Sequence, residues 1–152
     1  MGLLVVNKDA LIKQLRIHEG VRRNPYRDTK GILTVGVGHN MEANPLPSDW
    51  KFPLTDVQIN LLLSKDIDEI AKAPLDKNIP WYKSLNDARQ NVLLNMCFNM
   101  GWTTLSKFKN TLSLVQRGMF PEASKAMLQS KWAKDVGNRA VELAKIMEEG
   151  VL

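Results

Sequence analysis

Residues 18–39 read HEGVRRNPYRDTKGILTVGVGH, and this stretch decides the fold. Glu19 and Gly20 stand where a helical pattern stops, since glycine commonly ends a helix. Residues 25–31 are rich in turn formers, and residues 32–38 then alternate between aliphatic side chains and small ones. The stretch therefore predicts a helix end, a turn and a short β-strand in direct succession.

A first helix is expected before Gly20. Its apolar stripe consists of Leu11, Ile12 and Leu15, with Ile17 as a further candidate. Asn7 is expected to cap its N-terminus. Glu19 then lies in the last turn, where the negative end of the helix dipole favours a protonated carboxylic acid over a carboxylate. A general acid needs this protonated form.

The strand at residues 32–38 is expected to have two unlike faces. The aliphatic face consists of Leu33, Val35 and Val37 and is expected to point to the core. The opposite face consists of Thr34, Gly36 and Gly38. It has little bulk, so a ligand or another backbone could approach it closely. Asp28 is placed in the loop or hairpin just before this strand.

The remaining chain is expected to be mostly helical, over residues 55–72, 87–100, 108–117, 121–131 and 138–149. Thr55 and Gln58 form a capping box at the start of the first of these helices. Its apolar positions are Val57, Leu61, Leu62, Ile67 and Ile70. Pro74 and Pro80 are expected to close that region. Residues 40–54 contain three prolines and are expected to be loop.

These elements predict an α+β protein, mostly helical with a small N-terminal β lobe. The 152 residues, 44% of them hydrophobic, suit a single domain with a substantial core. Within it we expect a β lobe at about 17–56, a bridging helix at about 55–72 and a helical lobe at about 73–152 that also includes the first helix. A ligand cleft is expected between the lobes.

The composition argues against several classes of function. The formal net charge of +5 favours an anionic partner, although an ordinary solvated surface also explains it. No apolar run is long enough to span a bilayer, so stable membrane insertion is not expected. No signal peptide is recognised, so we expect the protein to be cytoplasmic. The single cysteine, Cys97, is expected in the core. The start of an H-E-x-x-H motif at His18 has Arg22 in place of the second histidine, so a metal site is not expected. Gly36 and Gly38 do not extend to a nucleotide-binding motif, so no cofactor is expected either.

Glu19, Asp28 and Thr34 remain as the candidate catalytic group. Two carboxyl groups can hydrolyse a glycosidic bond without a metal, one as acid and the other as base or nucleophile. A nearby hydroxyl can hold the attacking water. Taken singly, a glutamate at a helix end and an aspartate in a turn are ordinary structural residues. Their proximity in sequence to a glycine-rich strand with one threonine strengthens the case for a hydrolase, but the residues alone leave the structural reading open.

At these residues the chain resembles the phage-type lysozymes, or endolysins, of glycoside hydrolase family 24. That family has a Glu-Gly pair ending its first helix, a Tyr-x-Asp-Thr-x-Gly turn and a Thr-x-Gly-x-Gly-His strand. Matching segments here are Glu19-Gly20, residues 26–31 and residues 34–39. Further likeness at residues 95–101, 108–112, 130–132 and 138–140 extends the resemblance over nearly the whole chain.

The resemblance implies a lysozyme-like fold and a muramidase. Such an enzyme cleaves the β-1,4 bond between N-acetylmuramic acid and N-acetylglucosamine in peptidoglycan, with inversion. By position, Glu19 would be the general acid, while Asp28 and Thr34 would activate or position water. Arg139 matches an arginine that pairs with the catalytic glutamate, and such a cation favours the ionised carboxylate. His39 is expected to be a structural hydrogen-bonding residue rather than a catalyst.

Substrate contacts carried over from the family fall on Asn40, Phe98, Thr111 and Ala126. Phe98 agrees with the family pattern and Thr111 offers a similar hydroxyl, although Phe98 could equally be plain core. Asn40 and Ala126 depart from the pattern, so the detailed saccharide and peptide contacts are less well defined by sequence. The proline-rich segment at 40–54 departs too.

The resemblance also implies a biological setting. The protein would act in host-cell lysis, staying in the host cytoplasm until a holin allows it to reach the cell wall, and it would be a monomer. Other readings stay open: a non-catalytic peptidoglycan-binding protein on the same fold, and a lytic transglycosylase, which needs an acid but no hydrolytic water. A nucleic-acid-binding domain would suit the basic charge, but no motif supports it, so no nucleic-acid partner is expected.

Overall fold

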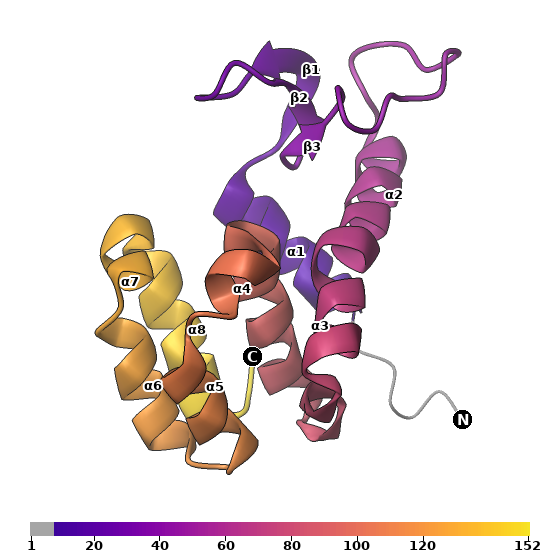
Figure 1. Ribbon diagram of the computed structural model, residues 1–152. Coiled ribbons are helices and arrows are strands. Elements are labelled where there is room, and N and C mark those ends of the chain that lie inside the picture. The colour runs from indigo at the N-terminus through magenta and orange to yellow at the C-terminus, as the bar shows by residue number, and fades with distance from the viewer. Residues whose placement is uncertain (1–7) are drawn as a thin grey trace. The chain divides into compact units, whose positions relative to one another are not determined.

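The computed structural model describes residues 8–152, which fall into two compact units, residues 8–69 and residues 70–152 (Figure 1). The first unit begins with α1 (Lys8–Glu19) and continues through three strands, β1 (Arg22–Arg27), β2 (Leu33–Gly36) and β3 (His39–Asn40). The helix α2 (Asp56–Asp66) completes it. The predicted α+β class, mostly helical with a small N-terminal sheet, is confirmed.

The helix α1 ends at Glu19, as the sequence predicted. The N–H of Gly20 donates to the Arg16 carbonyl at 3.1 Å, and Gly20 has a φ of +81°, a conformation that favours glycine. Ile17 does not join the apolar stripe, because it is 74% exposed. The expected cap, Asn7, lies outside the described residues. Contacts group α1 with the sheet and α2, and its packing with the C-terminal helices stays a prediction.

The three strands form an antiparallel sheet in the order β1-β2-β3. Thr34 on β2 lies opposite Tyr26 on β1 and opposite Asn40 on β3. The expected strand to residue 38 ends two residues earlier, because Gly36 and Gly38 take φ values of +70° and +71° and turn the chain into β3. Thr34, on the face of little bulk, is only 4% exposed, so neighbouring parts of the chain cover it closely.

The helix α2 starts at the predicted capping box. The Thr55 side chain accepts from the N–H of Gln58, and the Gln58 side chain accepts from the N–H of Thr55. Of its expected apolar positions, Leu62 and Ile67 are buried, whereas Val57 is 70% exposed and Leu61 is 59% exposed. The buried face of α2 consists of Ile59, Leu62, Leu63 and Asp66.

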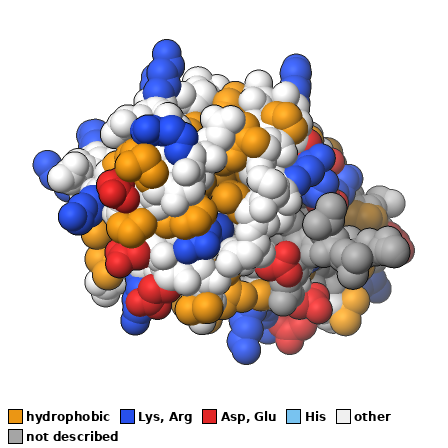
Figure 2. All heavy atoms as spheres, turned by 90° about the horizontal axis from the view of Figure 1, so that it is seen from below, with side chains coloured by type: hydrophobic (Ala, Val, Ile, Leu, Met, Phe, Trp, Pro, Cys, Tyr) orange, Lys and Arg blue, Asp and Glu red, His pale blue; other side chains and the backbone are white. Residues whose placement is uncertain are grey.

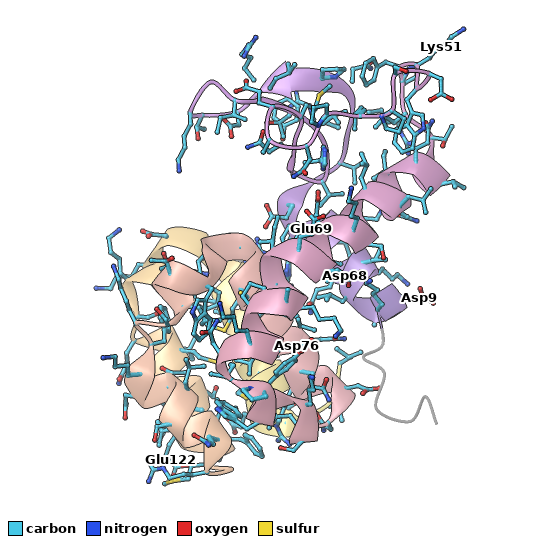
Figure 3. All side chains as sticks on the ribbon, turned by 45° about the vertical axis from the view of Figure 1, so that its right-hand side comes forward. Asp9, Lys51, Asp68, Glu69, Asp76 and Glu122 are labelled. Carbon is cyan, nitrogen blue, oxygen red and sulfur yellow. The ribbon has the colours of Figure 1, made fainter. Side chains whose placement is uncertain are left out.

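The helical path continues beyond residue 72, where the sequence predicted an end. A π-helix, η2 (Ile67–Lys72), follows α2 and leads into α3 (Ala73–Asn78). Pro74 lies in the first turn of α3, where the missing N–H is tolerated, so it opens a helix rather than closing one. Asp76 on α3 (Figure 3) accepts from Lys72 at 2.8 Å and from the Tyr82 hydroxyl at 2.7 Å, which ties α3 to the 3₁₀ helix η3 (Pro80–Ser84).

The second unit is built around α4 (Asp87–Leu105), whose residues from 90 to 97 are all buried, as predicted for a central helix. Gly101, with φ +80° and ψ 159°, breaks it. Cys97 is fully buried, its thiol donates to the Ile70 carbonyl, and burial raises its pKa to about 11. Cys97 is therefore a core residue, as the sequence predicted.

Four further helices complete this unit: α5 (Lys109–Gln116), α6 (Phe120–Leu128), α7 (Lys131–Val136) and α8 (Asn138–Glu149). Pro121 lies in the first turn of α6, as expected. The predicted single helix at 121–131 is two helices, because the Ser130 side chain accepts from the N–H of Ala133 and starts α7. No helix in residues 8–152 is long and apolar enough to cross a bilayer.

Candidate active site

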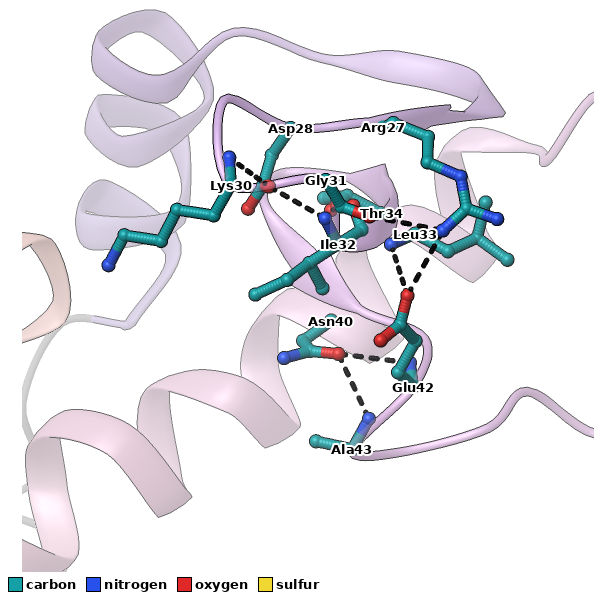
Figure 4. Close-up of polar contacts among 10 residues, drawn as sticks. All are labelled: Arg27, Asp28, Lys30, Gly31, Ile32, Leu33, Thr34, Asn40, Glu42 and Ala43. Atoms are coloured by element: carbon teal, nitrogen blue, oxygen red, sulfur yellow. Dashed lines mark hydrogen bonds and ion pairs between the residues drawn. The ribbon is translucent and has the colours of Figure 1, made fainter.

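Asp28 forms the turn that joins β1 to β2 (Figure 4). Its backbone N–H donates to the Ile32 carbonyl at 3.0 Å, and its carbonyl accepts from Gly31 at 2.9 Å. The side-chain Oδ1 accepts from the backbone N–H groups of Lys30 at 2.8 Å and Ile32 at 2.9 Å. An aspartate whose side chain accepts hydrogen bonds from the backbone N–H groups of the residues that follow it is a common turn former. Here these hydrogen bonds also fix the position of the carboxylate.

Thr34 is held by the same residue, Ile32. Its Oγ1 donates to the Ile32 carbonyl at 2.7 Å, so the peptide groups of Ile32 contact both candidate side chains. Oδ1 of Asp28 is occupied by two backbone donors, whereas no hydrogen bond from residues 8–152 reaches its Oδ2. The structure therefore brings Asp28 and Thr34 together on one hairpin and leaves one carboxylate oxygen available.

Glu42 stabilises this hairpin from the turn that follows β3, and sequence reasoning missed it. Its Oε2 accepts from the backbone N–H of Leu33 at 2.8 Å and from Arg27 at 3.3 Å, while Arg27 also donates to the Gly31 carbonyl at 3.0 Å. These bonds connect the ends of all three strands (Figure 4). An exposed glutamate in a turn-rich segment shows no sequence pattern that would reveal this role.

Glu19 is the last residue of α1, with its side chain exposed. β1 begins three residues later, at Arg22. The last turn of α1 is bound to α2, because Arg16 donates to Asn60 and to Asp56, each at 2.9 Å. Arg23 on β1 also donates to Asp56, at 2.7 Å, and the hydrogen bonds from Arg23 and then Arg16 hold the pKa of Asp56 below its usual value. The backbone that carries Glu19 is therefore fixed at the last turn of α1 and again at β1.

His39 is buried beneath the sheet and pairs with Asp66 of α2 at 2.7 Å through Nδ1. Its Nε2 lies 2.8 Å from the Asn44 carbonyl. Burial is the strongest influence and lowers the pKa of His39, but the hydrogen bonds to Asp66 and Asn44 outweigh it, so the pKa is raised above 6.5. Both ring nitrogens are occupied, which favours a structural role. Asp66 itself was missed by sequence reasoning, although it falls on the buried stripe of α2.

The sequence also matches a known protein family. The phage lysozyme family model matches residues 16–146, which is most of the chain and includes Glu19, Asp28 and Thr34. The chain belongs to the phage lysozyme family. Membership makes this lysozyme a glycoside hydrolase and implies peptidoglycan hydrolysis.

Two similar proteins of Dictyostelium discoideum extend the likeness over most of this chain and most of their own length. Probable T4-type lysozyme 1 is 28% identical over 91% of this chain and 93% of its own length. Probable T4-type lysozyme 2 is 27% identical over 94% of this chain and 96% of its own length. The pre-baseplate central spike protein Gp5 of Enterobacteria phage T4 is 29% identical over 94% of this chain but only 28% of Gp5. The family thus includes proteins from outside phages.

The predicted substrate-contact residues of this lysozyme fall in both units. Asn40 lies opposite Thr34 in the sheet, and its Oδ1 accepts from the N–H groups of Glu42 and Ala43, so it also builds a turn. Phe98 is half-buried on α4. Thr111 on α5 lines a pocket of about 530 Å³ together with Ala126, and Phe98 is not part of that lining.

Arg139, on α8, donates through Nε at 3.1 Å and Nη2 at 2.8 Å to Oδ1 of Asn95. Its pairing with Glu19 stays a prediction. No group of three or more histidine, cysteine, aspartate or glutamate side chains within residues 8–152 is placed to hold a metal ion.

Proposed function

We propose that this lysozyme cleaves the β-1,4 bond between N-acetylmuramic acid and N-acetylglucosamine in bacterial peptidoglycan, with inversion at the anomeric carbon. Glu19 protonates the leaving oxygen, Asp28 removes a proton from the attacking water, and Thr34 positions that water. Inversion requires room for a water between the two carboxyl groups, which stand about 6.5–9.5 Å apart in inverting enzymes. The observation that carries this proposal is the anchoring of Asp28 and Thr34 on Ile32.

The hydrogen bonds of the hairpin define how a water would be held. Because the Thr34 hydroxyl donates its hydrogen bond to the Ile32 carbonyl, its oxygen can still accept a hydrogen bond from water. Oδ2 of Asp28 can accept the other hydrogen, which leaves a water lone pair to attack the sugar. Only 4% of Thr34 is exposed, so the partner that we propose for it is a water rather than the polymer.

The exposure of Glu19 suits a general acid that must reach a bulky polymer. Its side chain lies at the surface, at the end of a helix whose last turn is bound to α2. A rigid support of this kind keeps a catalytic group in position without covering it.

Clearing of permeabilised Gram-negative cells by Glu19→Gln tests the proposal. We expect the wild type to clear the suspension and to release reducing ends, and Glu19→Gln to lose about 10²-fold or more of this rate, since general acid catalysis contributes on that order. Circular dichroism checks that the variant is folded. Glu69→Gln, at another exposed glutamate of the same unit (Figure 3), is the matched control and should keep full activity.

Three outcomes of this experiment would overturn the proposal. A folded Glu19→Gln that clears cells as fast as the wild type would remove Glu19 from the reaction. Anhydromuramic ends in place of reducing ends would make the enzyme a lytic transglycosylase. Wall binding without any released sugar would leave a non-catalytic protein.

Host-cell lysis with release by a holin is the setting that we propose for this activity. The chain is also similar to probable lysozymes from Dictyostelium discoideum, which is not a phage. The biological setting therefore has to be tested separately from the chemistry. Expression in a Gram-negative bacterial host with and without a co-expressed holin would test it: lysis is expected only with the holin, and lysis without it would contradict this release route.

A further inference from the structure

The peptide unit between Ile32 and Leu33 is hydrogen-bonded at both of its polar ends (Figure 4). Its carbonyl, which belongs to Ile32, accepts from the Thr34 hydroxyl at 2.7 Å and from the backbone N–H of Asp28 at 3.0 Å. Its N–H, which belongs to Leu33, donates to Oε2 of Glu42 at 2.8 Å. Because a peptide unit is planar, a group that holds its N–H also fixes the direction of its carbonyl. Glu42 therefore holds the same rigid unit that anchors Thr34.

The bond from Leu33 to Glu42 is of the stronger kind. Leu33 is the first residue of β2, and its carbonyl accepts from the backbone N–H of Met41 at 2.9 Å, as in an ordinary sheet. Its N–H, in contrast, donates to a carboxylate side chain. Hydrogen bonds to an ionised acceptor are shorter and about twice as strong as those between neutral groups. The N–H end of this peptide unit is therefore held firmly at the start of the strand.

Glu42 is itself oriented by its neighbours. Its backbone N–H donates to Oδ1 of Asn40 at 2.9 Å, and its Oε2 lies 3.3 Å from a guanidinium nitrogen of Arg27. The side chains of Arg27 and Glu42 are 66% and 53% exposed, and an exposed ion pair contributes little free energy. Acidic and basic side chains are also mixed elsewhere on the surface, as Figure 2 shows for one face. The ion pair thus orients the carboxylate, and the bond to Leu33 distinguishes Glu42 from an ordinary surface glutamate.

A chain of hydrogen bonds leads from Glu42 to the water that Thr34 would hold. The carboxylate polarises the peptide unit through its N–H, because hydrogen bonds in a chain strengthen one another. The carbonyl of Ile32 thereby becomes a stronger acceptor for the Thr34 hydroxyl. A hydroxyl that donates to a stronger acceptor is itself a better acceptor, so its oxygen holds a water more firmly. The charge of Glu42 can therefore act on that water without touching it.

We propose that Glu42 is a positioning residue for hydrolysis, which fixes and polarises the Thr34 hydroxyl through the peptide unit between Ile32 and Leu33. The inference rests on the proposed function, since it takes a water at Thr34 as the nucleophile. Glu42 acts on the position of the water rather than on the binding of the polymer. Its loss should therefore lower kcat and leave KM unchanged.

Kinetics on solubilised peptidoglycan test the role of Glu42. We expect Glu42→Ala to lose about tenfold in kcat at an unchanged KM, less than the roughly 10²-fold that a 1 Å misplacement can cost. Glu42→Gln, whose amide oxygen can still accept from Leu33, should recover part of this loss. Arg27→Gln should lose less than Glu42→Ala, because the bond to Leu33 remains. Glu69→Gln is the matched control and should keep the full kcat.

Two kinetic results would overturn the inference. A loss in Glu42→Ala that appears in KM would place Glu42 in polymer binding. A loss in Arg27→Gln as large as that in Glu42→Ala would show that the ion pair, and not the peptide unit, carries the effect. Circular dichroism on every variant checks that the fold is kept.

Coupling between Glu42 and Thr34 separates positioning from stability. If Glu42 acts through the Thr34 hydroxyl, its removal should cost nothing further once that hydroxyl is gone. We therefore expect Thr34→Val/Glu42→Ala to have the same kcat as Thr34→Val alone. Independent effects would multiply instead, and a multiplied loss would overturn the inference.

Nuclear magnetic resonance gives a readout independent of activity. The carbonyl carbon signal of Ile32 and the amide proton signal of Leu33 should both move upfield in Glu42→Ala and move less in Glu42→Gln. Glu69→Gln should leave both in place. Unmoved signals in Glu42→Ala would show that the chain of hydrogen bonds does not exist in solution, which overturns the inference.

Failure of this inference can be told apart from failure of the proposed function. If the wild type and Glu42→Ala cleave peptidoglycan at equal rates, the role of Glu42 is overturned and the muramidase stands. If the wild type cleaves no peptidoglycan, the muramidase is overturned, and with it any reaction that Glu42 could serve.

Discussion

An asparagine at position 28 would keep both backbone hydrogen bonds of the turn, because an amide oxygen accepts N–H groups as a carboxylate oxygen does. Asp28→Asn therefore isolates the charge from the fold. We expect its kcat/KM to fall by about 10²–10⁴-fold, the usual contribution of a general base, with an unchanged circular dichroism spectrum. Release of reducing ends measures the rate. Near-wild-type activity in this variant would show that the Asp28 charge does not take part.

The role of Thr34 can be tested by two substitutions, each of which changes one group of its side chain. Thr34→Ser keeps the hydroxyl that donates to the Ile32 carbonyl, whereas Thr34→Val keeps the shape and loses the hydroxyl. We expect Thr34→Val to lose about 10²-fold in kcat through misplaced water and about 1 kcal/mol of stability. Thr34→Ser should stay close to the wild type. Equal losses in both variants would point to packing rather than to the hydroxyl.

The buried pair of His39 and Asp66 should make stability depend on pH. Both ring nitrogens face acceptors, so only the protonated ring satisfies both. Because the folded pKa of His39 is raised, its contribution to the free energy of unfolding is fully present below about pH 6.5, the unfolded pKa, and is lost as the pH rises through the folded pKa.

Asp66→Asn is the test of this buried pair. We expect it to lower the free energy of unfolding by about 3 kcal/mol at pH 6 and to flatten the pH dependence above about pH 6.5, the unfolded pKa of histidine. Urea denaturation across that range measures both effects. A variant with the same slope as the wild type would mean that another group causes the pH dependence.

At the scale of elements, Arg89 of α4 holds the end of α8. It donates to the carbonyls of Met147 at 2.7 Å and Glu148 at 2.9 Å, and its guanidinium lies 3.6 Å from the centre of the Phe120 ring. We expect Arg89→Ala to lose about 2 kcal/mol of stability. Arg89→Lys should recover part of that loss, because it keeps the cation but not the two-pronged geometry. Thermal denaturation, with the exposed Lys145→Ala on α8 as control, would show whether the loss is specific.

The ends of elements could be predicted from the sequence, whereas their buried faces could not. Gly20 and the capping box at Thr55 act through their own backbone neighbours, so local chemistry was enough. In α2, apolar residues occupy several faces, and spacing alone does not say which face meets the sheet. Val57 and Leu61 were therefore counted with Leu62 among the apolar positions of the helix, but only Leu62 of these three is buried.

The candidate site shows the same division between local and distant contacts. Asp28 and Thr34 lie within one hairpin, so their spacing in the sequence pointed to their proximity. Asp66 lies 27 residues from His39, and only folding reveals that contact. A sequence signal did exist, because an aspartate on the stripe of Ile59 and Leu63 must find a partner if it is buried.

At the scale of the whole molecule, the basic charge is unevenly distributed. Residues 8–69 carry nine basic and nine acidic side chains, whereas residues 70–152 carry twelve and seven. The unit that contains Glu19, Asp28 and Thr34 is therefore neutral overall, despite its arginines at positions 22, 23 and 27. Long-range attraction to an anionic wall is expected to come from the second unit.

Lysis rates measured against salt concentration test this distribution. We expect the rate to fall as ionic strength rises towards about 0.15 M, where the Debye length is about 8 Å. Lys77→Gln/Lys145→Gln should weaken that dependence more than Arg22→Gln/Arg23→Gln does. A flat salt profile in the wild type would rule out steering by charge.

The hairpin also determines how this protein can tolerate change over generations. Asp28 and Thr34 are anchored by the N–H and the carbonyl of Ile32, which every residue other than proline possesses. Codons for position 32 can therefore drift among many amino acids without moving the water site. Loss or gain of a single codon between positions 28 and 34 would displace one anchor from the other. We expect related genes to keep the length of that segment constant while the amino acid at position 32 varies.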